Sequence, residues 1–306
     1  MFNAYLRRYS NNLQMEGVYV MSELRYLRLR KLKNALMLTL MLTLAFLTFL
    51  PLLLIIGSIT LEGIKVLLKA GVSFFASLPP KPTDVSLGGI APALIGSLIS
   101  SSIALSIAAS IAFISAFLTT EFPNNVISRV VEVVFRSFSG IPSLAVGMFV
   151  YSTVVVFMRT QSLIAGAVAL SIVGMPYAYV YFTSALRSIP EEYREAAMSL
   201  GMSRLKALRY VYLGISRKYL LSGLLITFAK IIGDTAPLLF TIGFVTNAYF
   251  MGLDKPSNAL PLLIFIYALS PYEIYHSVAL GAAFILLVTL IALFEIAHAV
   301  VKEVRL

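Results

Sequence analysis

Residues 190–214 read PEEYREAAMSLGMSRLKALRYVYLG, a charged, helix-forming segment that lies between long apolar stretches. The apolar stretches dominate the chain, since 59% of the 306 residues are hydrophobic and 12% are charged, and the mean hydropathy is +0.90. A soluble domain could not bury this much apolar surface, so the composition indicates a polytopic membrane protein. The charged segment must then stand outside the bilayer, where it is long enough to dock a partner.

Six apolar runs predict the transmembrane spans. A helix needs about 20 apolar residues to cross a bilayer, and five uncharged runs and a sixth run with two charges meet this requirement. We therefore predict an all-α protein in which residues 35–306 form one membrane domain. Its predicted spans are residues 35–57, 90–118, 137–158, 161–186, 219–245 and 274–297.

The distribution of basic residues predicts the orientation of the chain. With the amino terminus in the cytoplasm, 18 of the 24 Lys and Arg residues lie on cytoplasmic segments, in accord with the positive-inside rule. Both termini and the loop 187–218 are then cytoplasmic, and the protein is predicted to lie in the cell membrane. Because the basic residues flank membrane spans, the net charge of +10 indicates lipid headgroups, and no nucleic acid, as their partner.

Three segments outside the spans have informative patterns. Residues 1–34 alternate basic and apolar positions, which predicts an amphipathic helix on the inner membrane surface. Residues 58–87 contain Gly63, Gly71 and several prolines, and are predicted to form a broken external loop. Residues 260–269 are apolar but too short to cross the bilayer, so we predict a re-entrant or interfacial segment.

Residue counts exclude several kinds of chemistry. The chain has no cysteine, which excludes disulfides and thiolate metal sites, and its two histidines, His276 and His298, have no metal partner at ligand spacing. It also lacks the glycine-rich P-loop sequence that cradles nucleotide phosphates. We therefore predict no catalytic residue, no metal site and no cofactor on this chain. Any ATP must be hydrolysed by a partner subunit.

Local signals predict two short helices within the charged segment. Pro190 suits the first turn of a helix, Glu191 and Glu192 favour its positive amino end, and Gly201 is a good terminator. A second helix can then begin at Ser203. An ordinary amphipathic loop would give the same pattern, so on these residues alone both interpretations stay open.

The order of residues in this segment resembles the EAA loop of ABC importer permeases. The matching residues are Glu195, Ala196, Ala197, Gly201, Val211 and Leu213. The family pattern ends in proline, and this chain has Gly214 there. The resemblance implies a MetI-like permease core whose loop 187–218 is a coupling helix seated in a groove of a cytoplasmic ATPase. It assigns the polar contact to Glu195, while the docking surface is shaped by Ala196, Ala197 and Gly201.

Span five carries two ionisable residues, Lys230 and Asp234, which lie four residues apart and therefore on one face of a helix. Ionisable groups inside a bilayer are costly, and they mark a pathway or a buried pair. Pro237 disrupts the helix one turn beyond Gly233, and such breaks are tolerated where they line a cavity or pack on protein. A substrate contact and a structural ion pair both satisfy these constraints.

The segment 229–244, AKIIGDTAPLLFTIGF, is similar to the pattern of the PstA family of phosphate-importer permeases, with lysine and aspartate replacing arginine and glutamate. The similarity continues at residues 88–93, 140–143, 259–261 and 268–273. The substrate-pathway residues that it implies are Lys230, Gly233, Asp234, Thr235 and Pro237. Lysine cannot make the bidentate contact that arginine makes with an oxyanion, so this substitution changes the expected chemistry.

The same resemblance implies the other subunits of an ATP-driven phosphate importer. These are a PstB-type ATPase dimer, a PstC-type sister permease and an external phosphate-binding protein. Closure of the ATPase pair would move the loop around Glu195 as a lever and switch the spans between inward and outward access. This chain alone is then predicted to transport nothing.

Three alternatives remain beside this hypothesis. A permease for another oxyanion or small solute would carry the same loop. An ion-coupled secondary transporter would need inverted repeats or more intramembrane acids than Asp234 and Glu295. An integral membrane enzyme would need a constellation of nucleophile, base and metal that the spans do not offer.

Overall fold

The structure is a computed structural model that describes the backbone of residues 2–302 and the side chains of residues 30–302. Within this part of the chain every regular element is a helix, which confirms the all-α prediction. The chain divides into two compact units, residues 1–58 and residues 59–306. Each unit is described by itself.

Helix α1 (Phe2–Ala70) begins the chain and supplies the whole of the first unit. Every side chain from residue 30 to residue 56 is exposed, although this stretch belongs to the most apolar part of the helix. Such a surface is stable only inside a bilayer or against a protein partner. The predicted amphipathic pattern of residues 1–34 lies mostly outside the described side chains.

The prediction of a broken loop over residues 58–87 is wrong at its start, because α1 continues without interruption to Ala70. Gly63 is a site of close helix packing and does not break the helix. A Cβ atom on Gly63 would lie only 2.3 Å from the Cβ atom of Phe284. The break comes at Gly71, whose φ of 62° lies in the left-handed region that favours glycine.

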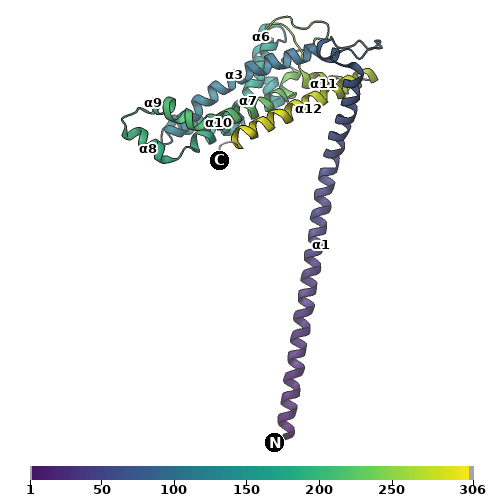
Figure 1. Cartoon of the computed structure of the whole chain (residues 1–306), viewed down its shortest axis with the longest axis vertical. Coiled ribbons are helices and arrows are strands. Elements are labelled where there is room, and N and C mark those ends of the chain that lie inside the picture. The colour runs from purple at the N-terminus through teal and green to yellow at the C-terminus, as the bar shows by residue number, and fades with distance from the viewer. Residues whose placement is uncertain (1, 303–306) are drawn as a thin grey trace. The chain divides into compact units, whose positions relative to one another are not determined.

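The second unit holds the remaining helices, and Figure 1 shows α3, α7, α10 and α12 packed side by side. In chain order they are α2 (Ser73–Ala76), α3 (Ala91–Glu121), α4 (Val126–Phe138), α5 (Ser143–Val150), α6 (Val156–Met158), α7 (Leu163–Arg187), α8 (Glu191–Ser199), α9 (Arg204–Ala207), α10 (Leu213–Ile232), α11 (Leu260–Ala268) and α12 (Glu273–Lys302). Two π-helical turns and one 3-10 turn complete the series, at Tyr151–Val155, Leu208–Tyr212 and Ala236–Leu239.

Four helices of the described chain are long and apolar enough to cross a membrane, and a bent pair raises the number to five. The four are α3, α7, α12 and the part of α1 from Arg30 to Ala70, and the pair consists of α4 with the segment Ser143–Met158, bent by 104°. Helix α10 occupies the predicted fifth span but carries Arg217, Lys218 and Lys230. The sixth crossing therefore stays a prediction.

Two predicted spans are not continuous helices. In the span predicted at 137–158, α4 ends at Phe138 and α5 begins at Ser143, because Pro142 has no N–H to continue the first helix. In the span predicted at 219–245, α10 stops at Ile232 and the chain continues as a 3-10 turn. The break at residues 139–142 falls within the predicted third span, which stays a prediction, whereas a break near Gly233 was expected.

An alanine stripe joins α3 to α7. Its members recur every four residues on α3 and are fully buried, namely Ala104, Ala108, Ala112 and Ala116. Small side chains let helix backbones approach closely, which favours helix association inside a bilayer. A Cβ atom on Gly174 of α7 would lie 3.6 Å from Ala108 Cβ and 2.6 Å from Ile231 Cδ1. Helices α3, α7 and α10 therefore meet closely at this point.

The apolar run 260–269 forms α11, which is too short to cross a bilayer. Leu260 and Leu263 are buried in a cluster that also contains Val278 of α12. The N–H of Leu260 donates to the hydroxyl of Ser97 on α3 at 2.7 Å. The helix is thus fixed to two long helices, and its depth in the membrane stays a prediction.

Candidate functional site

The first candidate site is the loop 187–218, which forms α8 and α9 where the sequence predicts them. Pro190 directly precedes α8, and both acidic residues of its first turn lie at its positive end. Gly201, two residues after α8 ends, has a φ of 74°, a left-handed value. Ser203 caps α9 by accepting a hydrogen bond from the N–H of Lys206.

After α9 the chain stays helical as it leaves the loop. The π-helical turn Leu208–Tyr212 leads directly into α10, and Gly214 lies within the first turn of that helix. No proline disturbs the junction. The exit of the second helix is therefore continuous with α10.

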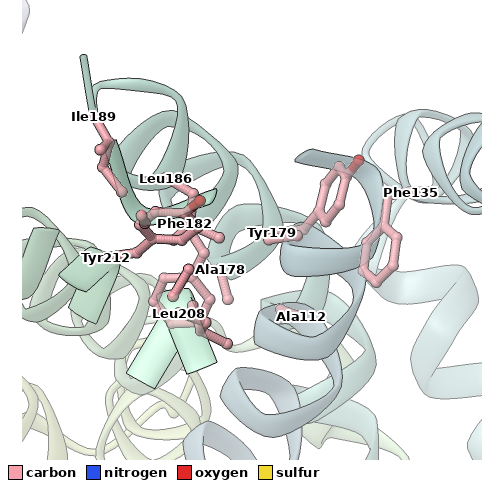
Figure 2. Close-up of a cluster of buried hydrophobic side chains, with 12 residues drawn as sticks. Ala112, Phe135, Ala178, Tyr179, Phe182, Leu186, Ile189, Leu208 and Tyr212 are labelled. Atoms are coloured by element: carbon pink, nitrogen blue, oxygen red, sulfur yellow. The ribbon is translucent and has the colours of Figure 1, made fainter. Parts of the chain in front are cut away.

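The two faces of α8 have different environments. Ala197 is 3% exposed and belongs to a hydrophobic cluster. Other members of this cluster are Leu186, Leu208 and Tyr212, which are labelled in Figure 2. Glu195 and Ala196 are exposed, and Glu195 has no ion pair within residues 30–302. Ala197 therefore shapes the loop from inside, whereas the free carboxylate of Glu195 is available to a partner.

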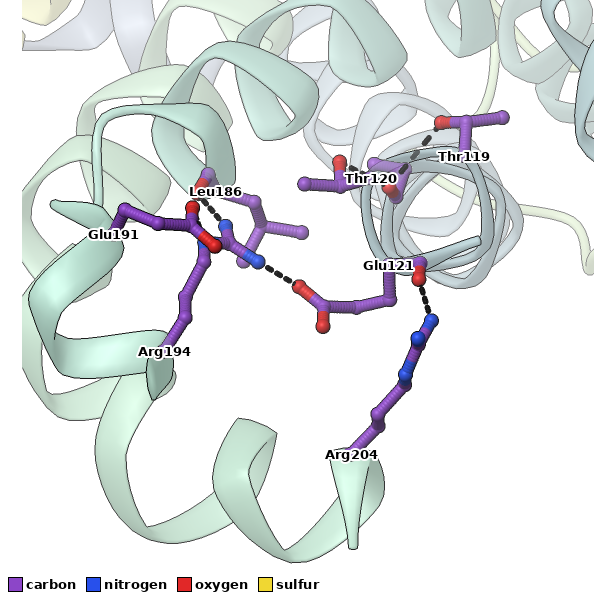
Figure 3. Close-up of polar contacts among 8 residues, drawn as sticks. Thr119, Thr120, Glu121, Leu186, Glu191, Arg194 and Arg204 are labelled. Carbon is purple, nitrogen blue, oxygen red and sulfur yellow. Dashed lines mark hydrogen bonds and ion pairs between the residues drawn. The ribbon is translucent and has the colours of Figure 1, made fainter. Parts of the chain in front are cut away.

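Two arginines of the loop hold the end of α3. Arg194 of α8 forms an ion pair with the carboxylate of Glu121, and Arg204 of α9 donates a hydrogen bond to the backbone carbonyl of the same residue (Figure 3). Arg194 also donates to the carbonyl of Leu186 at 2.6 Å, and the guanidinium of Arg204 lies 4.4 Å from the ring centroid of Phe122. We call Glu121, Arg194 and Arg204 the arginine clasp.

A cavity of about 610 Å³ lies between the loop and the end of α3. Its charged lining residues are Glu121, Arg187, Glu191, Arg194, Glu195 and Arg204. Tyr212 also lines it, and burial, followed by the charge of Glu121, raises the pKa of this hydroxyl. The ring centroid of Tyr212 lies 5.0 Å from the guanidinium of Arg194.

The second candidate site is the end of α10. The Nζ atom of Lys230 lies 3.4 Å from Oδ2 of Asp234, with 42% of the lysine side chain exposed but only 7% of the aspartate. The ring centroid of Tyr177 on α7 lies 5.5 Å from the same Nζ atom. Oδ1 of Asp234 accepts a hydrogen bond from the N–H of Ala236 at 3.3 Å. Asp234 thus binds the first N–H of the 3-10 turn Ala236–Leu239 while it pairs with the lysine.

Lys230 lines two cavities. One, of about 100 Å³, also contains Asp234 and Tyr177 together with Ser139 and Ser143, which flank the break between α4 and α5. The other, of about 360 Å³, contains Gly233 and is lined on its far side by α12. The end of α10 and the break between α4 and α5 therefore open into the same small polar space.

Two predicted pathway residues, Thr235 and Pro237, lie in the turn after α10. Thr235 and Pro237 do not line either of these cavities. Pro237 is buried against α5, where a Cβ atom on Gly147 would lie 2.9 Å from its Cα atom. The carbonyl of Thr235 accepts from the N–H of Leu238 at 3.1 Å. These two residues build the turn that positions Asp234.

Sequence reasoning missed the partners of both sites. Tyr177 follows Pro176 inside an apolar helix, and a proline in span four was the available signal for a cavity there. Ser139 and Ser143 flank a Gly-Ile-Pro segment that the sequence marks as a break. Glu121 carried no local signal, because its partners lie more than 70 residues away along the chain.

These features together define a class of protein. Several helices of the described chain are apolar and long enough to cross a membrane, a charged pair lies at a helix end, and a polar loop carries a carboxylate with no ion pair among residues 30–302. Charged residues near membrane depth beside a helix break are typical of membrane transport proteins. Residues 108–305 match the family described as "Binding-protein-dependent transport system inner membrane component". The chain belongs to this family.

Relatives match nearly the whole chain. It is 34% identical over 287 residues to the "Probable phosphate transport system permease protein PstA" of Methanocaldococcus jannaschii, covering 94% of this chain and 100% of the relative. The PstA protein of Pasteurella multocida is 29% identical, covering 87% and 91%. The PstA protein of Yersinia pestis is 30% identical, covering 72% and 74%. The predicted resemblance to PstA permeases is confirmed.

Solved structures show the same fold. An inward-facing structure of the MetNI methionine ABC transporter aligns with a TM-score of 0.53 at 19% identity, covering 68% of this chain and 93% of that chain. An amino acid ABC transporter aligns with a TM-score of 0.51 at 22% identity, covering 69% and 90%. These similarities confirm the predicted MetI-like permease fold.

Proposed function

We propose that this chain is the membrane permease subunit of an ATP-driven importer for inorganic phosphate. The observation that carries the proposal is the 34% identity to a protein named as a probable phosphate transport permease, over 94% of this chain and 100% of that relative. The chemistry of the α10 site supports the same cargo. A half-exposed lysine in a small polar cavity offers positive charge and hydrogen-bond donors to an oxyanion.

In this proposal Lys230 is the cation that phosphate meets, and Asp234 limits how tightly phosphate is held. The carboxylate lies 3.4 Å from the lysine Nζ atom, so it offsets part of the positive charge. A transport site must bind its cargo well enough to admit it and weakly enough to release it. Gly233, Thr235 and Pro237 shape the turn that fixes this pair in place.

The loop 187–218 couples the permease to ATP hydrolysis in partner subunits. The exposed carboxylate of Glu195 makes the polar contact with a PstB-type ATPase, while Ala196 and Gly201 let the partner approach closely. An ATPase dimer, a PstC-type sister permease and an external phosphate-binding protein complete the assembly. The chain lies in the cell membrane with both termini and this loop in the cytoplasm.

Reconstitution tests the proposal. The complex purified through a tag on this chain is placed in liposomes with ATP inside and the phosphate-binding protein outside, and uptake of radiolabelled inorganic phosphate is measured. We expect a P-loop ATPase and a second permease to copurify, and uptake to require ATP. Transport of sulfate or another solute in place of phosphate would reject the cargo. Transport driven by an ion gradient without ATP would reject the mechanism.

A further inference from the structure

The arginine clasp is the polar link between the loop and a helix from a distant part of the sequence. Glu121 is the last residue of α3, and the loop reaches it from both of its short helices, through Arg194 on α8 and Arg204 on α9. One arginine binds the carboxylate and the other binds the backbone carbonyl (Figure 3). The end of α3 is therefore held from two sides by the loop.

Burial makes this link stronger than an ordinary surface ion pair. The side chains of Arg194 and Glu121 are 14% and 8% exposed, whereas exposed pairs contribute little to stability. Arg194 is further fixed by the Leu186 carbonyl and by the face of the Tyr212 ring. A buried, multiply bonded arginine has few alternative conformations, so it can transmit a displacement instead of absorbing it.

The helix that the clasp holds does not need the clasp for its own packing. Tyr179 on α7 donates a hydrogen bond to Thr119 Oγ1 on α3 at 3.0 Å, one turn or less from Glu121. The buried alanines of α3 continue this contact along the helix. Loss of the Glu121 carboxylate would therefore leave α3 packed on α7 and would remove the ion pair to α8, while Arg204 of α9 keeps its bond to the backbone carbonyl.

We propose that Glu121 is a positioning residue that transmits movement of the coupling loop to α3. Arg194 binds the carboxylate of Glu121, and Arg204 binds its backbone carbonyl. Helices α8 and α9 and the end of α3 therefore move as one body when the ATPase pulls on the loop. The inference rests on the proposed function, because it assumes that an ATPase docks on this loop. It adds a residue outside the family's loop motif to the coupling mechanism.

Coupling efficiency tests this role directly. The complete complex carrying Glu121→Gln is reconstituted, and ATP hydrolysis and uptake of radiolabelled inorganic phosphate are measured in the same vesicles. We expect hydrolysis to persist while phosphate taken up per ATP falls about tenfold, within the usual range of coupling free energies. Glu132→Gln is the matched control, since Glu132 pairs with Arg136 on the surface of α4, and its ratio should stay unchanged.

A second measurement does not depend on the cargo. The chain has no cysteine, so Ser110→Cys on α3 and Glu192→Cys on α8 provide its only sites for spin labels. We expect the distance distribution between the labels to stay narrow in the nucleotide-free complex and in the complex trapped with ATP and vanadate. With Glu121→Gln added, we expect it to broaden. If wild-type vesicles take up no phosphate, the proposed cargo fails, but this distance still decides the role of Glu121.

Three results would overturn the proposal. The first is an unchanged distance distribution in the Glu121→Gln complex. The second is an equal fall of hydrolysis and uptake in that variant, which marks a loss of intact complex. The third is failure of the Glu121→Gln complex to assemble, while Glu121→Asp, which keeps the charge, restores the yield of assembled complex and has no further effect. A residue that behaves in this way is structural and does not transmit movement.

Discussion

The Nζ atom of Lys230 lies 3.4 Å from the Oδ2 atom of Asp234 at the point where α10 ends. The aspartate is buried and bonded to the backbone, while the lysine is half-exposed and lines two cavities. The lysine is therefore the more exposed member of the pair, although both side chains line the smaller cavity. This asymmetry favours a contact with an anionic cargo over a closed ion pair.

We expect Lys230→Gln to reduce phosphate uptake about tenfold or more while the complex still assembles. Glutamine keeps a polar side chain that is one bond shorter but removes the charge, and hydrogen bonds to a charged group contribute about 1.5–3 kcal/mol. Uptake by the reconstituted complex is the measurement. Lys255→Gln, which alters an exposed pair with the adjacent Asp254, is the control. Uptake near the wild-type rate would favour a purely structural pair.

We expect Glu195→Lys to leave the protein in the membrane but weaken its association with the ATPase about tenfold or more. The reversal places a cation where the partner is expected to offer positive charge or donors, and like charges across an interface are strongly unfavourable. Copurification of the ATPase at several salt concentrations measures the effect. Glu62→Lys is the control, because it makes the same charge change on α1, outside the loop. Normal association together with normal uptake would contradict the role of Glu195.

We expect Gly201→Val to destabilise the loop by about 1–2 kcal/mol, because a branched side chain is strained in the left-handed conformation at a φ of 74°. Gly214→Ala serves as the opposite case, since Gly214 lies in a helix with no atom within 4 Å of an added Cβ. That change should stabilise by about 0.5–1 kcal/mol. Thermal unfolding of the detergent-solubilised complex compares them, and equal melting temperatures for the two variants would refute the assignment.

We expect Gly147→Ala to lower both stability and uptake, because its Cβ atom would lie 2.9 Å from the Cα atom and the carbonyl oxygen of Pro237. Overpacking of this kind costs about 1–3 kcal/mol, and relief requires a shift of the turn that holds Asp234. Gly140→Ala is the control, since its nearest atom would lie at 3.5 Å. A variant with wild-type melting temperature and uptake would show that this contact does not position the site.

Local chemistry explains which parts of the structure could be predicted from the sequence. Proline before a helix, acidic residues in its first turn and a glycine after it act within a few residues, so α8 was predictable. Gly63 was misinterpreted because its role depends on Phe284, a residue on another helix. A glycine can end a helix, or it can let two helices pack closely, and the residue that faces it on another helix decides which role it has.

Long-range pairs were out of reach for a similar reason. The chain has 24 basic residues and 14 acidic ones, and nothing in their spacing singles out Glu121 as the partner of Arg194. The pair Lys230 and Asp234 was predictable because four residues separate its members on one helix. Tyr177 was not, since it reaches the same lysine from α7.

Helix α7 carries Tyr177, which faces the cavity of Lys230, and Leu186, whose carbonyl is bonded to Arg194 of the loop. One helix thus extends from the cavity of Lys230 to the loop on which the ATPase is proposed to dock. Thermodynamic linkage makes any coupling between two such binding events reciprocal. The factor by which ATPase docking changes the affinity for phosphate must equal the factor by which bound phosphate changes the affinity for the ATPase. Under the proposed function, the affinity of the permease for its ATPase would therefore depend on whether phosphate is bound.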